Sequence, residues 1–394
     1  MSLVARQGII ARKRTTTPVV PNDPDEAIFM PVSYGSLAAA RTALNAPSDA
    51  NYVMWNHDGQ GLEQVFASLG NNDILVLPER AEPYPIDSSN GFMAAGASAI
   101  TGPNGTRTPI VSNNRLWFAM CRARRGVIGL GPGAIIEPTN SGWTAPPQPK
   151  PMYWFNTAGE QQSELIGAQC VLMEVDNPNP FFANFTIKGR DFGGVAYNGM
   201  SLPANNNGVI KRIHFNQSWR GFESVPNGET GAIKFLRNYY TIENCLFTPH
   251  PTLGPSPIMW NITSGGVMRN VKVKKHTIGM ITFWRCLGLN TFENVYTDSN
   301  KTALNLEEEE AGFELNWTGG EILIDGSLNG WHLNINPSGG SQKIHLSNVT
   351  ASLNGYVPGK LCAQVYTTSN TQKRSDVTWD GGEVGYIPAS RWID

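Results

Sequence analysis

The chain lacks any segment that is apolar enough to cross a membrane. None of its 394 residues lies in an unbroken run of 18 apolar residues, which is about the length that a transmembrane helix needs. The first residues also lack the apolar core of a secretory signal. We therefore expect a protein that is made in the cytoplasm and is not inserted in a membrane.

The chain is also short of net charge and of cysteine. Its 30 basic and 32 acidic residues leave a net charge of −2, which does not favour nucleic-acid binding. No two cysteines show the Cys-x-x-Cys spacing of a metal site or a redox pair. We expect buried thiols rather than a disulfide framework from Cys121, Cys170, Cys245, Cys286 and Cys362.

Common catalytic motifs are missing as well. The six histidines show no His-Glu-x-x-His spacing, and no Gly-x-Ser-x-Gly elbow is present. Residues 129–133 are glycine-rich like a phosphate-binding loop, but Pro132 has no amide to donate and the next residues indicate a strand instead of a helix. We therefore expect neither a metal nor a cofactor.

What the sequence does contain is a short motif that recurs eight times in its second half. A polar residue, most often Asn, is followed by an apolar, a variable and a second, mostly apolar residue. Subtracting successive starts gives steps of 28, 32, 26, 24, 27, 27 and 35 residues, a period typical of a stacked solenoid. The starts are Asn184, Arg212, Asn244, Asn270, Asn294, Glu321, Asn348 and Glu383.

The apolar positions of this motif predict a continuous core. Alternation of inward and outward residues indicates a half-buried strand, and stacked copies would bury their apolar faces on one another. We expect Val271, Val295 and Val349 to lie over one another inside. The first apolar residues are Phe185, Ile213, Cys245, Val271, Val295, Ile322, Val349 and Val384.

The Asn at five of the eight starts suggests a ladder of side-chain amides, because an amide both donates and accepts hydrogen bonds. Arg212, Glu321 and Glu383 should break that ladder, at corners that are more exposed or differently bent. A second strand is expected about ten residues after several starts, as at 194–197, 221–222, 279–280, 303–306 and 330–333. The sequence thus predicts an all-β chain, a right-handed single-stranded parallel β-helix.

The first third of the chain differs from the repeats. Residues 36–45 predict a short helix, and Leu62, Val65, Phe66 and Leu69 predict a capping helix that starts at Asp58 and ends at Gly70. A strand over 72–78 and a turn at 84–86 follow. We divide the chain into an N-terminal arm and short helix for virion attachment (1–50), a capping helix with irregular first coils (51–125) and the parallel β-helix (126–394).

This order of helix, strand and tyrosine resembles the beginning of pectate-lyase-like β-helices, including phage tailspikes and minor tail proteins, over about residues 60–386. The resemblance implies a tail protein of the phage virion. It also implies a homotrimer whose N-terminal arm binds other tail proteins and whose solenoid binds host-surface glycan. The chain has neither the Gly-His-Gly signature of polygalacturonases nor the Asp cluster of pectate lyases. A polysaccharide depolymerase and a purely structural tail component stay open as alternatives.

Aromatic and polar residues near the second strand suggest where a glycan would bind. An exposed indole can stack on a sugar ring, and outward polar residues can bind its hydroxyls. The Glu307–Glu310 run is expected to form an exposed turn, with a Ca²⁺ site or a catalytic carboxylate pair as alternatives. The candidate groove residues are Trp219, Glu223, Trp284, Asn305, Glu307 and His332.

Overall fold

The fold is taken from a computed structural model of the protein. It describes residues 26–56, 60–86, 100–102, 105–107, 109–112, 115–138, 151–155, 161–165, 170–175, 177, 179–189, 193–198, 206–216, 222–225, 238–248, 258–261, 265–276, 281–284, 286–299, 302–307, 312–324, 331–336, 342–353, 360–365 and 372–385.

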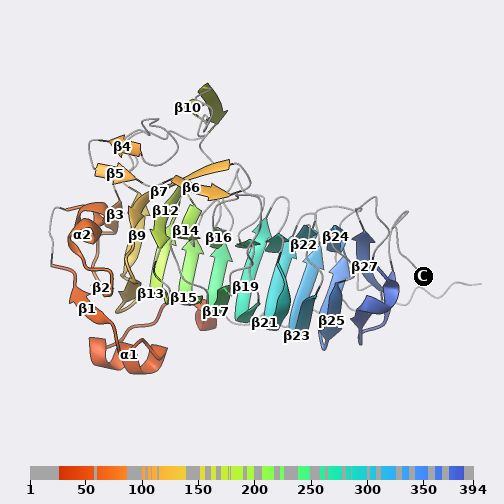
Figure 1. The fold of residues 1–394 in the computed structure, drawn as a ribbon. Coiled ribbons are helices and arrows are strands. Elements are labelled where there is room, and N and C mark those ends of the chain that lie inside the picture. The colour runs from red at the N-terminus through yellow and green to blue at the C-terminus, as the bar shows by residue number, and fades with distance from the viewer. Residues whose placement is uncertain are drawn as a thin grey trace, which may run out of the picture.

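Two long, mostly parallel sheets run along the molecule (Figure 1). One has 14 described strands, among them β13 (Phe181–Lys188), β15 (Asn206–Asn216), β17 (Asn238–Thr248), β19 (Gly266–His276), β21 (Gly288–Ser299), β23 (Phe313–Ile324), β25 (Lys343–Ser347), β26 (Thr350–Leu353) and β28 (Val377–Trp379). The other has 11, among them β12 (Cys170–Val175), β14 (Gly193–Asn198), β16 (Phe222–Val225), β18 (Ile258–Asn261), β20 (Ile281–Trp284), β22 (Thr302–Glu307), β24 (Trp331–Asn336), β27 (Lys360–Val365) and β29 (Glu383–Gly385).

The chain alternates between these sheets, so that each circuit adds a parallel strand to both. The result is an all-β parallel solenoid. Four of the expected second strands correspond to β14, β16, β22 and β24. The residues 279–280 lie outside the described part of the chain, and β20 begins directly after them at Ile281.

Each long strand of the 14-stranded sheet bends at a residue with positive φ. This left-handed conformation is costly for most residues, and Asn tolerates it better than most. The bends occur at six of the eight predicted starts, with φ values of 62° at Asn184, 51° at Arg212, 53° at Asn244, 50° at Asn270, 53° at Asn294 and 52° at Asn348. Arg212 bends like the others, so the expectation of a different bend there is wrong.

The predicted amide ladder is present at three successive corners. The Asn270 amide nitrogen donates to the Asn244 side-chain oxygen over 3.1 Å, and Asn294 donates to Asn270 over 3.2 Å. At each of these corners the Asn adopts the left-handed conformation and its side chain hydrogen-bonds the Asn of an adjacent coil.

The two remaining predicted starts are wrong. In β23 the bend lies at Gly319 and Gly320, with φ of 69° and 95°, because glycine adopts this conformation without strain. Val295 pairs with Gly320, which puts Glu321 two residues past the corner. Glu383 begins β29, which pairs with β27 in the 11-stranded sheet. The alternating apolar residues after Glu383 therefore belong to that sheet and not to the 14-stranded sheet that contains the corners.

The interior is one apolar cluster that extends along the solenoid. Val271 and Val295 pair directly and are fully buried. Gly320 occupies the next layer, and Val349, which is 4% exposed, occupies the layer after that. The pairs Thr318–Ser347 and Glu321–Thr350 on either side align Gly320 with Val349. The predicted stacking of the three valines is confirmed, with one glycine layer between them.

The N-terminal elements include α1 (Leu37–Leu44), β1 (Asn51–Met54), α2 (Leu62–Ser68), β2 (Asp73–Leu77), β3 (Tyr84–Ile86), β8 (Gly126–Gly129) and β9 (Ile135–Pro138). The Ser36 hydroxyl caps α1, which ends at Asn45 in the left-handed conformation. The residue that precedes α2 is Gly61 and not Asp58, which lies outside the described residues. The four apolar residues predicted for α2 are buried in the inner cluster.

Three antiparallel hairpins depart from the parallel arrangement. They join β4 (Ile100–Gly102) to β5 (Gly105–Arg107), β6 (Pro109–Ser112) to β7 (Arg115–Arg122), and β10 (Pro151–Phe155) to β11 (Gln161–Leu165). In Figure 1 they lie beside the N-terminal coils. No helix in the described part of the chain is long and apolar enough to span a membrane.

Candidate functional site

Four of the six candidate glycan residues occupy one face of the 11-stranded sheet. Glu223 pairs with Met259, Met259 with Thr282, and Thr282 with Asn305, which places these residues in a single column across four strands. Trp284 pairs directly with Glu307 in the next column on the same face, two residues further along. We call these two columns the polar face.

Alternation along β20 and β22 assigns the polar face to the side of the sheet opposite the core, and Thr282 within it is 4% exposed. The residues that alternate with it are fully buried in the inner cluster: Ile281, Phe283, Leu304 and Leu306. Asn305 is partly exposed, and the Asn334 amide donates to its side-chain oxygen over 2.8 Å. This Asn pair repeats, on a second sheet, the amide stacking seen at the corners.

His332 does not share this exposed surface. Its ring is fully buried, Nδ1 accepts from the backbone N–H of Cys362 at 2.9 Å, and Nε2 lies 2.9 Å from the Ser352 carbonyl. Nε2 therefore carries the proton, and burial lowers the pKa of the ring. Both nitrogens are used inside the protein, which leaves none for a ligand.

The remaining candidates are only partly described. Trp219 lies outside the described residues, as do Glu308, Glu309 and Glu310. Glu307 ends β22, one residue after the predicted strand end at Leu306. In the described part of the chain, no group of three or more His, Cys, Asp or Glu side chains could hold a metal ion.

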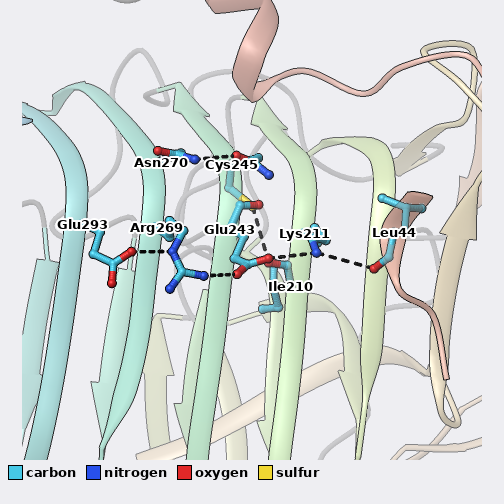
Figure 2. Close-up of polar contacts among 9 residues, drawn as sticks. Leu44, Ile210, Lys211, Glu243, Cys245, Arg269, Asn270 and Glu293 are labelled. Atoms are coloured by element: carbon cyan, nitrogen blue, oxygen red, sulfur yellow. Dashed lines mark hydrogen bonds and ion pairs between the residues drawn. The ribbon is translucent and has the colours of Figure 1, made fainter. Parts of the chain in front are cut away.

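A ladder of alternating charges lies on the 14-stranded sheet, one residue before the corners (Figure 2). Lys211 approaches Glu243 at 2.9 Å, Glu243 approaches Arg269 at 2.7 Å, and Arg269 approaches Glu293 at 2.5 Å. The hydrogen bond between the last two raises the pKa of Arg269 and lowers that of Glu293. Because neighbouring charges neutralise one another, this charge ladder stabilises strand register and carries no net charge for a ligand.

Residues 26–34, which we call the N-terminal strap, cross the corners on the outside of the solenoid. Asn184 binds the backbone of Val32 twice, accepting its N–H and donating to its carbonyl, each over 2.8 Å. Arg212 donates to the carbonyls of Ile28 at 3.5 Å and Met30 at 3.3 Å. Two corner side chains that do not join the amide ladder, Asn184 and Arg212, thus hold the strap.

The strap begins with η1 (Glu26–Phe29), which packs against β15, β17 and β19. Phe29 is fully buried, with its ring 6.3 Å from the Tyr296 ring in an edge-on contact. Glu26 forms ion pairs with Lys272 at 3.8 Å and with Lys274. The sequence analysis did not predict this contact, although the apolar run from Ala27 to Val32, after the charged first part of the arm, is a signal for it.

The glycine-rich loop at 129–133 holds a carboxylate from the same chain. The Gly133 amide donates to Glu79 Oε1 at 3.5 Å, and the Ser33 hydroxyl donates to the same oxygen at 3.0 Å. A side chain at Gly131 would meet Glu79 Oε1 at 2.1 Å. The loop therefore fixes Glu79 and the end of the strap.

No protein-family model, curated protein or solved structure matches this chain.

Proposed function

We propose that the chain is a bacteriophage tail protein that binds a host-surface glycan along the polar face. In this proposal the solenoid is a right-handed β-helix that resembles the pectate-lyase-like tailspikes, α2 caps its first coil, and three copies assemble on the virion. The observation that supports the binding site is the alignment of Glu223 with Asn305 and of Trp284 with Glu307 in adjacent columns.

The spacing of these columns suits an elongated polymer. Adjacent strands lie about 4.8 Å apart, and residues two apart along a strand are separated by about 6.6 Å. Amides and carboxylates bind sugar hydroxyls, and an indole offers a flat apolar surface to a sugar ring. Such groups, spread over four adjacent strands, favour a chain of repeated sugars over a small molecule.

A binding experiment tests the proposed site. The purified full chain is passed over immobilised bacterial capsular and cell-wall polysaccharides, beside the variants Trp284→Ala and Asn305→Ala. We expect at least one polysaccharide to bind and each variant to bind about tenfold more weakly, a loss of roughly 1.4 kcal/mol. Asn316→Ala, on the other sheet, is the matched control and should bind normally.

Two outcomes would replace the proposal. Binding to none of the polysaccharides would favour a purely structural tail component. Release of reducing ends or unsaturated sugars from a bound polysaccharide would show a depolymerase instead. Virion attachment is tested separately by looking for the chain in purified particles and by asking whether a variant that lacks residues 1–25 is still incorporated.

A further inference from the structure

The N-terminal strap covers a column of outward residues from four adjacent strands. His214, Leu246, Lys272 and Tyr296 pair in succession across β15, β17, β19 and β21. Leu246 is only 1% exposed, although it alternates with the core residues Cys245 and Phe247 and is not part of the inner cluster. An apolar outward residue is therefore sheltered where the strap packs.

The charged groups around the strap are few. Glu26 is the carboxylate of η1, and Lys272 and Lys274 of β19 pair with it. Arg212 of β15 binds strap carbonyls, and β17 contributes the uncharged Leu246 and Thr248. β21 contributes Tyr296 and, two residues further along the same face, the carboxylate Asp298. Lys272 is 8% exposed, so its side of the ion pair with Glu26 is largely shielded from water.

His214 lies in the same cluster. Its Nε2 is 3.2 Å from the Thr248 hydroxyl, which also hydrogen-bonds the Asn216 side chain at 3.1 Å. Burial, with a smaller contribution from Lys274, lowers the pKa of His214 from 6.5 to about 4. A proton on this ring would add a third positive charge beside the two lysines.

We propose that residues 26–32 form a latch that acid releases: protonation of His214, beside Lys272 and Lys274, frees the strap from β15, β17 and β19. The direction of the pH dependence follows from the protonation of His214 when the strap is bound and when it is free. Above pH 6.5 the ring is neutral whether the strap is bound or free, so the latch keeps its full stability. As the pH falls from 6.5 to about 4, the free state takes up a proton that the bound state resists, and the latch weakens.

Hydrogen exchange at the Val32 amide measures the release, because this amide donates to Asn184 in the bound strap. Its protection factor, corrected for the intrinsic exchange rate at each pH, should fall between pH 7 and pH 4. If release fully exposes His214, the shift from 6.5 to about 4 allows a fall of at most about 300-fold. The Trp55 amide, bonded to the Val76 carbonyl, is the internal control and should change far less.

Two variants separate the latch from general acid unfolding. His214→Gln cannot gain a charge and should lose most of the pH dependence, whereas Glu26→Gln should loosen the strap already at pH 7. His345→Gln, at an exposed position of β25, should behave like the unmodified protein. Equal pH profiles for His214→Gln and His345→Gln would overturn the proposal.

A second measurement covers the case in which His214→Gln does not fold. The His214 ring is titrated by NMR in the unmodified protein and in Phe29→Ala, which weakens strap packing. We expect the titration midpoint to rise by at least one pH unit in Phe29→Ala. An unchanged midpoint would show that the strap does not control protonation of His214.

Discussion

Replacing Asn270 by alanine tests whether the corner residues hold adjacent coils together. Asn270 has a φ of 50° and takes part in two side-chain hydrogen bonds, one with Asn244 and one with Asn294. Each bond contributes about 1 kcal/mol net, and a left-handed alanine costs about 1 kcal/mol more. The expected loss is about 3 kcal/mol for alanine, and about 2 kcal/mol for glycine, which adopts this φ without strain.

Exchange of the backbone amides of β17, β19 and β21 gives the local opening free energy, which suits a solenoid whose coils contact only their neighbours. A loss of 3 kcal/mol corresponds to about 100-fold faster exchange in Asn270→Ala. Asn316→Ala is the control, because Asn316 lies in β23 without a positive φ. Equal exchange rates in Asn270→Ala and Asn316→Ala, or a larger loss with glycine than with alanine at position 270, would contradict a role of the Asn270 side chain in holding adjacent coils together.

Three further results are expected. Gly320→Ala should lower the free energy of unfolding in urea by about 4 kcal/mol, because the added Cβ would lie 2.1 Å from the Val295 carbonyl oxygen. Gly312→Ala, at a similar φ with no atom within 4 Å, should lower it by about 1 kcal/mol. Equal losses in the two variants would contradict the role of close packing at Gly320. Burial raises the pKa of the Cys245 thiol to about 12, so iodoacetamide at pH 8 should leave it unmodified in the native protein and label it in urea. Peptide mapping measures the labelling. Rapid labelling of the native protein would contradict the burial of this thiol. Arg269→Ala should lower the free energy of unfolding by about 1 kcal/mol at low salt and by less in 1 M NaCl, because Arg269 forms partly exposed ion pairs with Glu243 and Glu293. A loss that does not change with salt would show that the charge ladder acts through packing alone.

The corner residues explain how much of the fold the sequence could predict. Six starts were found because Asn or Arg at a left-handed corner precedes an inward apolar residue. The pattern failed at Gly319 and Gly320, where glycine supplies the same φ without a polar side chain. It failed at Glu383 because alternation identifies a strand but not the sheet that the strand joins.

The candidate site was predictable to a similar degree. Alternation placed Asn305 on the outward face together with the positions of Glu223 and Glu307, whereas Trp284, expected in or near a turn, is the last residue of β20. It could not show that the ring of His332 is enclosed by Cys362 and Ser352, which belong to later coils. The strap was out of reach for the same reason, since Val32 and Asn184 are 152 residues apart and no repeat relates them.

The corners stay in register although the number of residues between them changes. From Asn184 to Asn294 the steps are 28, 32, 26 and 24 residues, yet each corner stands beside the next, so a change in the length between two corners does not shift their register. Segments between coils can therefore lengthen, shorten or exchange composition while the interior keeps its packing. Such a scaffold can acquire new recognition loops by insertion, which makes it suited to rapid diversification and to the grafting of foreign peptides.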